Sequence, residues 1–202
     1  MKDLIKDHKD DWRMYGLVPY NISPIQQGIQ FGHAVQEYNN MIFDSLYIKH
    51  EKPELKEAFD SWRYYGKTFI VLNGGTTNSR IIDDIPFGSL NQHLKTLKEI
   101  GIVTAEFYEP DLGEQLTAIV FLVPKEVYNK KEFSGFEDYI KTLGYTEAFV
   151  DFLKLCHNSK DDENIMQTEF KEYIEVYNKW VETLGGEQNV KLREFLSQFS
   201  FA

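Results

Sequence analysis

The chain has 202 residues, which is enough for one domain of ordinary size and a small appendage. Hydrophobic residues make up 42% of it and aromatic residues 15%, so it can bury the apolar surface that a disordered chain lacks. The net charge of -10 opposes non-specific attraction to phosphate and argues against a nucleic-acid partner. One cysteine excludes an internal disulfide, no apolar run approaches the roughly 18 residues of a membrane span, and the charged first residues carry no secretory signal. These features predict a cytoplasmic protein with no membrane segment.

Short apolar runs and amphipathic stretches alternate through the first 125 residues. Ser23 followed by Pro24 is typical of a helix start, because serine caps the first turn and proline fits the first helical position. β-Branched and aromatic residues mark the strands, and leucines at helical spacing mark the helix that opens at Ser89. The predicted elements, in chain order, are a charged arm (1–12), a strand (13–21), a helix (24–48), a partly helical connection (54–62), a strand (67–75), a helix (89–101), a strand (102–109), a tight turn (110–113) and a strand (115–124).

This order predicts the fold class. Strands joined through helices run parallel, whereas the two strands around the turn run antiparallel. We therefore expect an α/β protein whose mixed four-stranded sheet is flanked by helices in an α/β/α sandwich. In residues 126–202, aromatic and aliphatic side chains recur every three or four positions. They predict a C-terminal helical extension (126–202) after the α/β domain (1–125), with helices that could form a homodimer or bind a protein partner.

Two glycines inside the first predicted helix need a reason. Glycine costs about 1 kcal/mol relative to alanine in a helix interior, and Gly28 and Gly32 stand four residues apart on one face. We expect both to face the sheet so that the two backbones approach closely, with Ile25 and Ile29 beside the same seam.

Polar side chains form a stripe beside that seam, at spacings of four, three and four residues: Gln26, Gln30, His33 and Glu37. A solvated helix face accounts for the stripe without any chemistry. In a second interpretation, His33 is half-buried and satisfied by a nearby carbonyl. The third interpretation is a functional site.

The segment IQQGIQFGHAV (25–35) resembles the signature helix of the type II peptidyl-tRNA hydrolases. In that family a Gln precedes a small residue, a His and an Ala, and here the matching residues are Gln30, Gly32, His33 and Ala34. This resemblance favours the functional interpretation of the stripe.

A second segment, PDLGEQLTAIVFLVP (110–124), is similar to the family's Asp-x-Gly turn and its Thr-containing last strand. Asp111, Gly113 and Thr117 match those places. The form EPDxGxQLTAI resembles phage-encoded relatives of the family. The resemblance spans roughly Arg13 to Pro124 and implies the mixed four-stranded sheet that the residue pattern also predicts.

The resemblance implies hydrolysis of the ester between a peptidyl group and the tRNA ribose, with no cofactor and no metal. This reaction needs an activated water and a donor for the developing oxyanion. Asp111 would be the general base or would orient His33, and Thr117 and Gln30 would hold the substrate carbonyl. The residues implied as catalytic are His33, Asp111 and Thr117, and those implied as substrate-binding are Gln26, Gln30 and Gln115.

This sequence departs from the family in two places. The family carries a lysine seven residues before the histidine, where this chain has Gln26. A lost cation of this kind is typically worth a few kcal/mol of transition-state stabilisation. The loop between Gly113 and Thr117 is also several residues shorter. Ordinary turn chemistry is the alternative explanation of Asp111, because Pro-Asp-x-Gly is common in turns.

Three further features have competing interpretations. Residues 73–79, NGGTTNS, could form a backbone cradle for an anion, or a flexible connection that continues through 80–88. Trp62, Tyr64 and Tyr65 suit core packing or, with basic neighbours, a platform for stacked bases. No metal-ligand spacing is found, so we expect no structural zinc and a buried, unreactive cysteine; the residues concerned are His8, His50, His93, His157 and Cys156.

Two functions therefore stand against each other. The first is a peptidyl-tRNA hydrolase, for which tRNA is the partner although the net charge disfavours it. The second is a catalytically inactive module that keeps the fold and binds a small ligand or a protein, and a phage accessory protein would suit this description.

Overall fold

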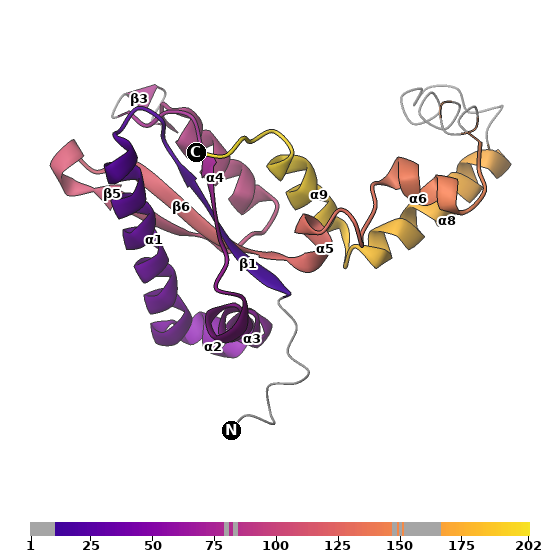
Figure 1. Cartoon of the computed structure of the whole chain (residues 1–202), viewed down its shortest axis with the longest axis horizontal. Coiled ribbons are helices and arrows are strands. Elements are labelled where there is room, and N and C mark those ends of the chain that lie inside the picture. Colours follow the sequence, from indigo (N-terminus) through magenta and orange to yellow (C-terminus); the bar gives the residue numbers. More distant parts are fainter. Residues whose placement is uncertain (1–10, 79–80, 83–84, 147–148, 150, 152–166) are drawn as a thin grey trace. The chain divides into compact units, whose positions relative to one another are not determined.

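Four strands form one mixed sheet in a computed structural model, which describes residues 11–78, 81–82, 85–146, 149, 151 and 167–202. The order of the strands across the sheet is β2-β1-β6-β5 (Figure 1). β1 is parallel to β2, and β6 is antiparallel to both of its neighbours, which confirms the predicted mixed sheet. The bounds of these strands are β1 (Trp12–Val18), β2 (Phe69–Asn73), β5 (Ala105–Glu109) and β6 (Gln115–Pro124).

The chain divides into two compact units. The first comprises Met1–Lys125 together with Glu194–Ala202, and the second comprises Glu126–Arg193. Residues 194–202 were predicted to be part of the helical extension. They belong to the first unit instead, because the main chain near residue 201 pairs with β2.

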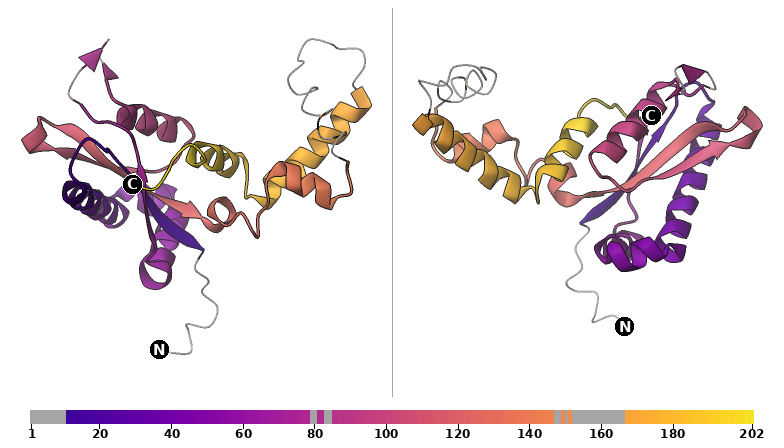
Figure 2. Two further views of the ribbon diagram at one scale, coloured as in Figure 1. Left: turned by 45° about the horizontal axis from the view of Figure 1, so that its top comes forward. Right: turned by 180° about the vertical axis from the view of Figure 1, so that it is seen from behind.

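Helices cover both faces of the sheet, as an α/β/α sandwich requires (Figure 2). On one face α1 to α3 share a core with Met14, Val18 and Val120, whereas α4 places Leu90 near Leu17 on the other face. The elements of the first unit besides the sheet are α1 (Pro24–Asp44), α2 (Leu46–Glu51), α3 (Pro53–Ser61), a π-helical turn (Trp62–Gly66), the short strands β3 (Ile81–Ile82) and β4 (Ile85–Pro86), α4 (Ser89–Glu99) and a 3-10 turn (Pro110–Leu112). β3 and β4 pair within the stretch that was predicted to be a loop.

The first helix ends earlier than predicted. Ser45 has extended backbone angles, so the helix that was expected to reach Ile48 stops at Asp44. The Ser45 N–H donates to the Met41 carbonyl, and its side chain accepts from the Ile48 N–H. One serine therefore ends α1 and caps α2.

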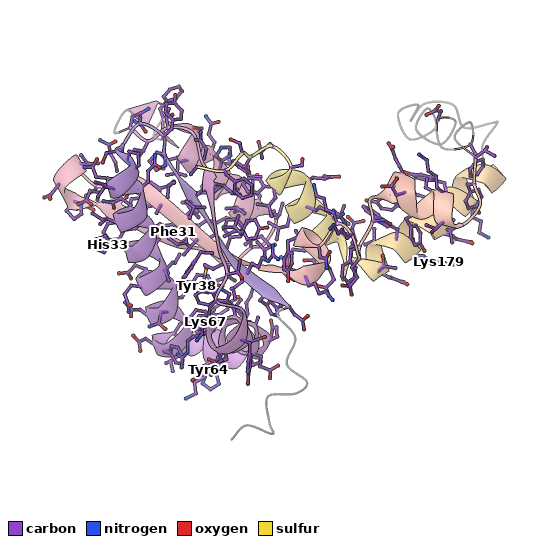
Figure 3. The ribbon with its side chains drawn as sticks, in the orientation of Figure 1. Phe31, His33, Tyr38, Tyr64, Lys67 and Lys179 are labelled. Carbon is purple, nitrogen blue, oxygen red and sulfur yellow. The ribbon has the colours of Figure 1, made fainter. Side chains whose placement is uncertain are left out.

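The prediction for Gly28 and Gly32 was wrong. Both glycines are exposed, and a Cβ added at either would meet no heavy atom of another element within 4 Å. Phe31, Ala34 and Tyr38 (Phe31 and Tyr38 are labelled in Figure 3) form the buried face of α1 instead.

The close approach occurs at a different glycine. A Cβ at Gly16 of β1 would lie 2.3 Å from the ring of Phe31. Glycine is needed there because the Phe31 ring occupies the space above the strand.

The second unit is helical. Its elements are α5 (Lys125–Tyr128), which begins at the last residue of the first unit, α6 (Phe136–Thr142), α8 (Gln167–Thr183) and most of α9 (Glu187–Leu196). Trp180, Val181 and Leu184 form its buried cluster, and the Phe136 ring packs 5.3 Å from that of Trp180. Within the predicted helical extension, residues 147–148, 150 and 152–166, and Cys156 with them, lie outside the described residues. Within the described ranges, no helix is long and apolar enough to cross a bilayer.

Candidate functional site

The start of α1 is fixed by a reciprocal cap between two side chains. The Ser23 hydroxyl oxygen accepts from the Gln26 N–H at 3.3 Å, and Gln26 Oε1 accepts from the Ser23 N–H at 3.1 Å and from its hydroxyl at 3.0 Å. Gln26 is exposed, and its side-chain oxygen is committed to this capping box.

A buried hydrogen-bond network joins α1 to the last two strands. The Thr117 hydroxyl donates to Gln30 Oε1 at 2.8 Å and also approaches the Phe107 carbonyl at 3.2 Å. Gln30 Nε2 donates to the Glu109 carboxylate. Thr117 is completely buried and Gln30 is 5% exposed. Gln30 and Thr117 are among the predicted site residues, whereas Glu109 is not.

This network fixes the orientation of the Gln30 amide. A carboxylate only accepts, so the amide nitrogen must face Glu109, and the amide oxygen is then left for the Thr117 hydroxyl. Buried amides and hydroxyls are costly unless they are paired, which explains why the three side chains occur together. Gln30 and Thr117 therefore position α1 on the sheet rather than present free donors to a substrate.

The turn after β5 presents Asp111 at the surface. The Glu109 carboxylate that binds Gln30 also accepts from the Asp111 N–H at 3.4 Å. Gly113 adopts a left-handed conformation (φ 69°) and donates to the Pro110 carbonyl at 3.0 Å. Ordinary turn chemistry thus accounts for the Pro-Asp-x-Gly backbone, while the Asp111 side chain remains exposed.

His33 lies on the exposed side of α1 (Figure 3). Its ring stacks on the Phe107 ring of β5, with centroids 4.5 Å apart and planes inclined by 20°. It is not half-buried against a carbonyl, so that interpretation was wrong. Among the described contacts, no hydrogen bond joins His33 to Asp111. Gln115 is half-buried and lies opposite Glu109 in the β5–β6 ladder.

Some of the predicted residues are in direct contact, and others are linked only through a third residue. Gln30 and Thr117 touch directly. His33 is linked to the network through Phe107, whose carbonyl also accepts from Thr117, and Asp111 is linked through Glu109. Glu109 could not be recognised from the sequence, because nothing local to residue 109 shows that a buried amide from α1 will lie beside it.

Tyrosines near this region remain protonated. Burial, and then the negative charge of Glu106, raise the pKa of Tyr108. Complete burial strongly raises the pKa of Tyr38 on α1. Neither phenol is therefore a base at neutral pH.

The loop over residues 73–78 does not form the anion cradle that was considered. Its N–H groups are already donors within the protein: Gly74 to the Val18 carbonyl, Gly75 to Asn73 Oδ1, Thr76 to Ser89 Oγ and Thr77 to Asn21 Oδ1. Since an anion site needs unused donors, the loop is a structural connection.

The aromatic residues before β2 divide into two kinds. Trp62 is buried and its indole N–H donates to the Thr68 carbonyl at 3.0 Å, as expected for a core residue. Tyr64 is 58% exposed, with the Arg63 guanidinium 4.6 Å from its ring centre. In the ranges that the structure describes, no cluster of His, Cys, Asp and Glu suits a metal ion.

Family models and curated proteins give no match to this chain. The fold is an α/β/α sandwich in which buried Gln30 and Thr117 are hydrogen-bonded to each other and Gln30 also donates to half-buried Glu109, while His33 and Asp111 are exposed.

Proposed function

We propose that the protein is a hydrolase of the type II peptidyl-tRNA hydrolase kind, which cleaves the ester between a peptidyl group and the tRNA ribose in the cytoplasm. One observation carries this proposal. Gln30 and Thr117 belong to two motifs 87 residues apart, and their side chains are hydrogen-bonded in the core. The helix motif and the turn motif thus meet at one end of the sheet, as a shared site requires.

The proposed reaction begins with attack of a water oxygen on the ester carbonyl carbon. The carbon–oxygen bond to the ribose then breaks, and the ribose oxygen takes the proton that His33 accepted from the water. His33, exposed and held by stacking on Phe107, is the group that accepts the proton from water. Asp111 is the second acceptor on the same surface.

Three other side chains of the site act indirectly, and a fourth is a direct donor. Gln30, Thr117 and Glu109 are positioning residues, because their polar atoms are engaged with one another. The Gln26 amide nitrogen is the neutral donor that stands in for the family's lysine toward the oxyanion.

The decisive experiment measures release of a labelled N-acyl-amino acid from tRNA by the purified protein. We expect the His33→Ala and Asp111→Asn variants to lose about 100-fold or more of the rate, in line with loss of a general base. His50→Ala removes an exposed histidine of α2 and serves as the matched control, with an unchanged rate. Absence of release above buffer would end the hydrolase proposal.

A binding module without catalysis is the second candidate, and the saturated network favours it. Gln26 Oε1, Gln30 and Thr117 are all committed to internal hydrogen bonds, and the net charge of -10 opposes tRNA. In a phage-type accessory protein that binds a small ligand or a protein partner, this network would stabilise the fold and take no part in catalysis. Titration of tRNA at increasing salt distinguishes the two, because binding through phosphate contacts weakens steeply with salt.

A further inference from the structure

Residues 200–202 cover the outer edge of β2, an edge strand of the sheet. Leu72 and Phe201 form an antiparallel bridge. The Asn73 N–H donates to the Ser200 carbonyl at 3.0 Å, and the Ala202 N–H donates to the Val71 carbonyl at 3.1 Å. The two hydrogen bonds flank the bridge, which is the antiparallel pattern. The C-terminal end marked in Figure 2 thus forms one antiparallel bridge beside β2.

The preceding residues are anchored by aromatic contacts with α4. His93 meets the Phe199 ring edge-to-face at 4.8 Å between centroids, and the Phe195 ring at 5.8 Å. Phe195 is buried, whereas Phe201 is 78% exposed. Pairing at residues 200–202 therefore depends on main-chain hydrogen bonds, each worth roughly 0.5–1.5 kcal/mol, and it can open without disrupting the anchored part.

We propose that residues 200–202 cover a self-association surface, and that β2 pairs with β2 of a second copy of the chain when they leave it. The edge has the composition for this. β2 reads Phe-Ile-Val-Leu-Asn, with no charge and no proline, and Phe69 is 48% exposed. Uncovered edge strands of this kind pair with other strands.

A second copy is the partner that this edge fits. Two identical strands paired antiparallel are related by a two-fold axis, so the contact closes at a dimer. The backbone orientation also suits this pairing. The Thr68 carbonyl accepts from the Met14 N–H, so the main-chain groups of Thr68 face β1. Because this direction alternates from one residue to the next, Val71 directs its N–H and carbonyl groups to the outer edge.

The test compares the full chain with a variant that ends at Phe199, by sedimentation velocity over a range of protein concentrations. We expect the shortened variant to dimerise with a dissociation constant at least about tenfold lower than that of the full chain. A shortened variant that carries Val71→Pro is the matched control. It loses an outward N–H that an edge strand can spare, so it should be monomeric.

Two results would overturn the proposal: a shortened variant that stays monomeric at every concentration, or a dimer that persists with Val71→Pro. Circular dichroism shows whether the shortened variant is folded. If it is not, Ala202→Pro in the full chain removes only the N–H that donates to Val71. This variant should also dimerise more strongly than the wild type, and wild-type behaviour would again overturn the proposal.

Discussion

The hydroxyl of Thr117 donates a 2.8 Å hydrogen bond to Gln30 Oε1 between β6 and α1, and both residues are buried. This contact is part of the core as well as of the candidate site. A change at either residue therefore affects stability before it affects chemistry, and experiments on the site need unfolding measurements beside activity.

Thr117→Val tests the cost of breaking this contact. Valine has nearly the same shape, but it leaves Gln30 Oε1 buried without its donor, so we expect a loss of about 1–3 kcal/mol in the free energy of unfolding. Urea denaturation measures it. Thr96→Val, at an exposed position of α4, should change stability by no more than about 0.5 kcal/mol. Equal losses for the two variants would contradict the role given to the network.

Gln26→Lys restores the cation that the family carries. If the protein is a hydrolase, the rate of N-acyl-aminoacyl-tRNA cleavage should rise about tenfold or more, because a charged donor stabilises the oxyanion better than an amide. The change also removes the oxygen that accepts from Ser23, so stability should fall by about 0.5–1 kcal/mol. Gln92→Lys, at an exposed position of α4 on the other face of the sheet, adds the same charge away from the site and should leave the rate unchanged.

Two glycine substitutions should have opposite effects on thermal stability. Gly16→Ala places a Cβ 2.3 Å from the Phe31 ring, so the strand or the ring must move, and overpacking of this kind costs about 1–3 kcal/mol. Gly28→Ala meets open space on α1 and should stabilise by about 0.5–1 kcal/mol through helix propensity. Destabilisation by Gly28→Ala would show that this helix face is covered in solution.

His93 should make stability fall in mild acid. Burial lowers its pKa from the ordinary 6.5, so the unfolded chain takes up a proton before the folded chain does. The contribution of neutral His93 to the free energy of unfolding is fully present above about pH 6.5, and it is lost as the pH falls from there toward the lower pKa of the folded state. Urea unfolding at several pH values measures this slope. His93→Phe keeps a ring beside Phe199 and should reduce the slope, whereas His50→Gln, exposed on α2, should not.

The sheet and its mixed direction were predictable because the signals are local. β6 is an unbroken apolar run, and its predicted bounds, 115–124, are those observed. A helix between two strands requires a parallel pair, whereas a tight turn requires an antiparallel one. Ser45 was missed as a helix end because serine is tolerated inside helices, and only its extended backbone shows the break.

The site was predicted less completely, because its contacts depend on the helix phase and on tertiary packing. Ile25 and Ile29 suggested that their side of α1 is buried, but they are 77% and 50% exposed. Phe31, Ala34 and Tyr38 set the phase instead, and they turn both helix glycines outward. Glu109 and the return of residues 194–202 to the sheet involve partners distant in the chain, for which the sequence contains no local signal.

The first unit is completed by residues that are synthesised after the second unit. β1, β2, β5 and β6 all precede residue 126, whereas the segment that covers the β2 edge follows the whole second unit. At about 5–20 residues per second, a ribosome takes several seconds to add residues 126–193. Throughout that interval the uncharged β2 edge of the nascent sheet is uncovered. These seconds are therefore the period in which the β2 edges of neighbouring nascent chains can pair with each other.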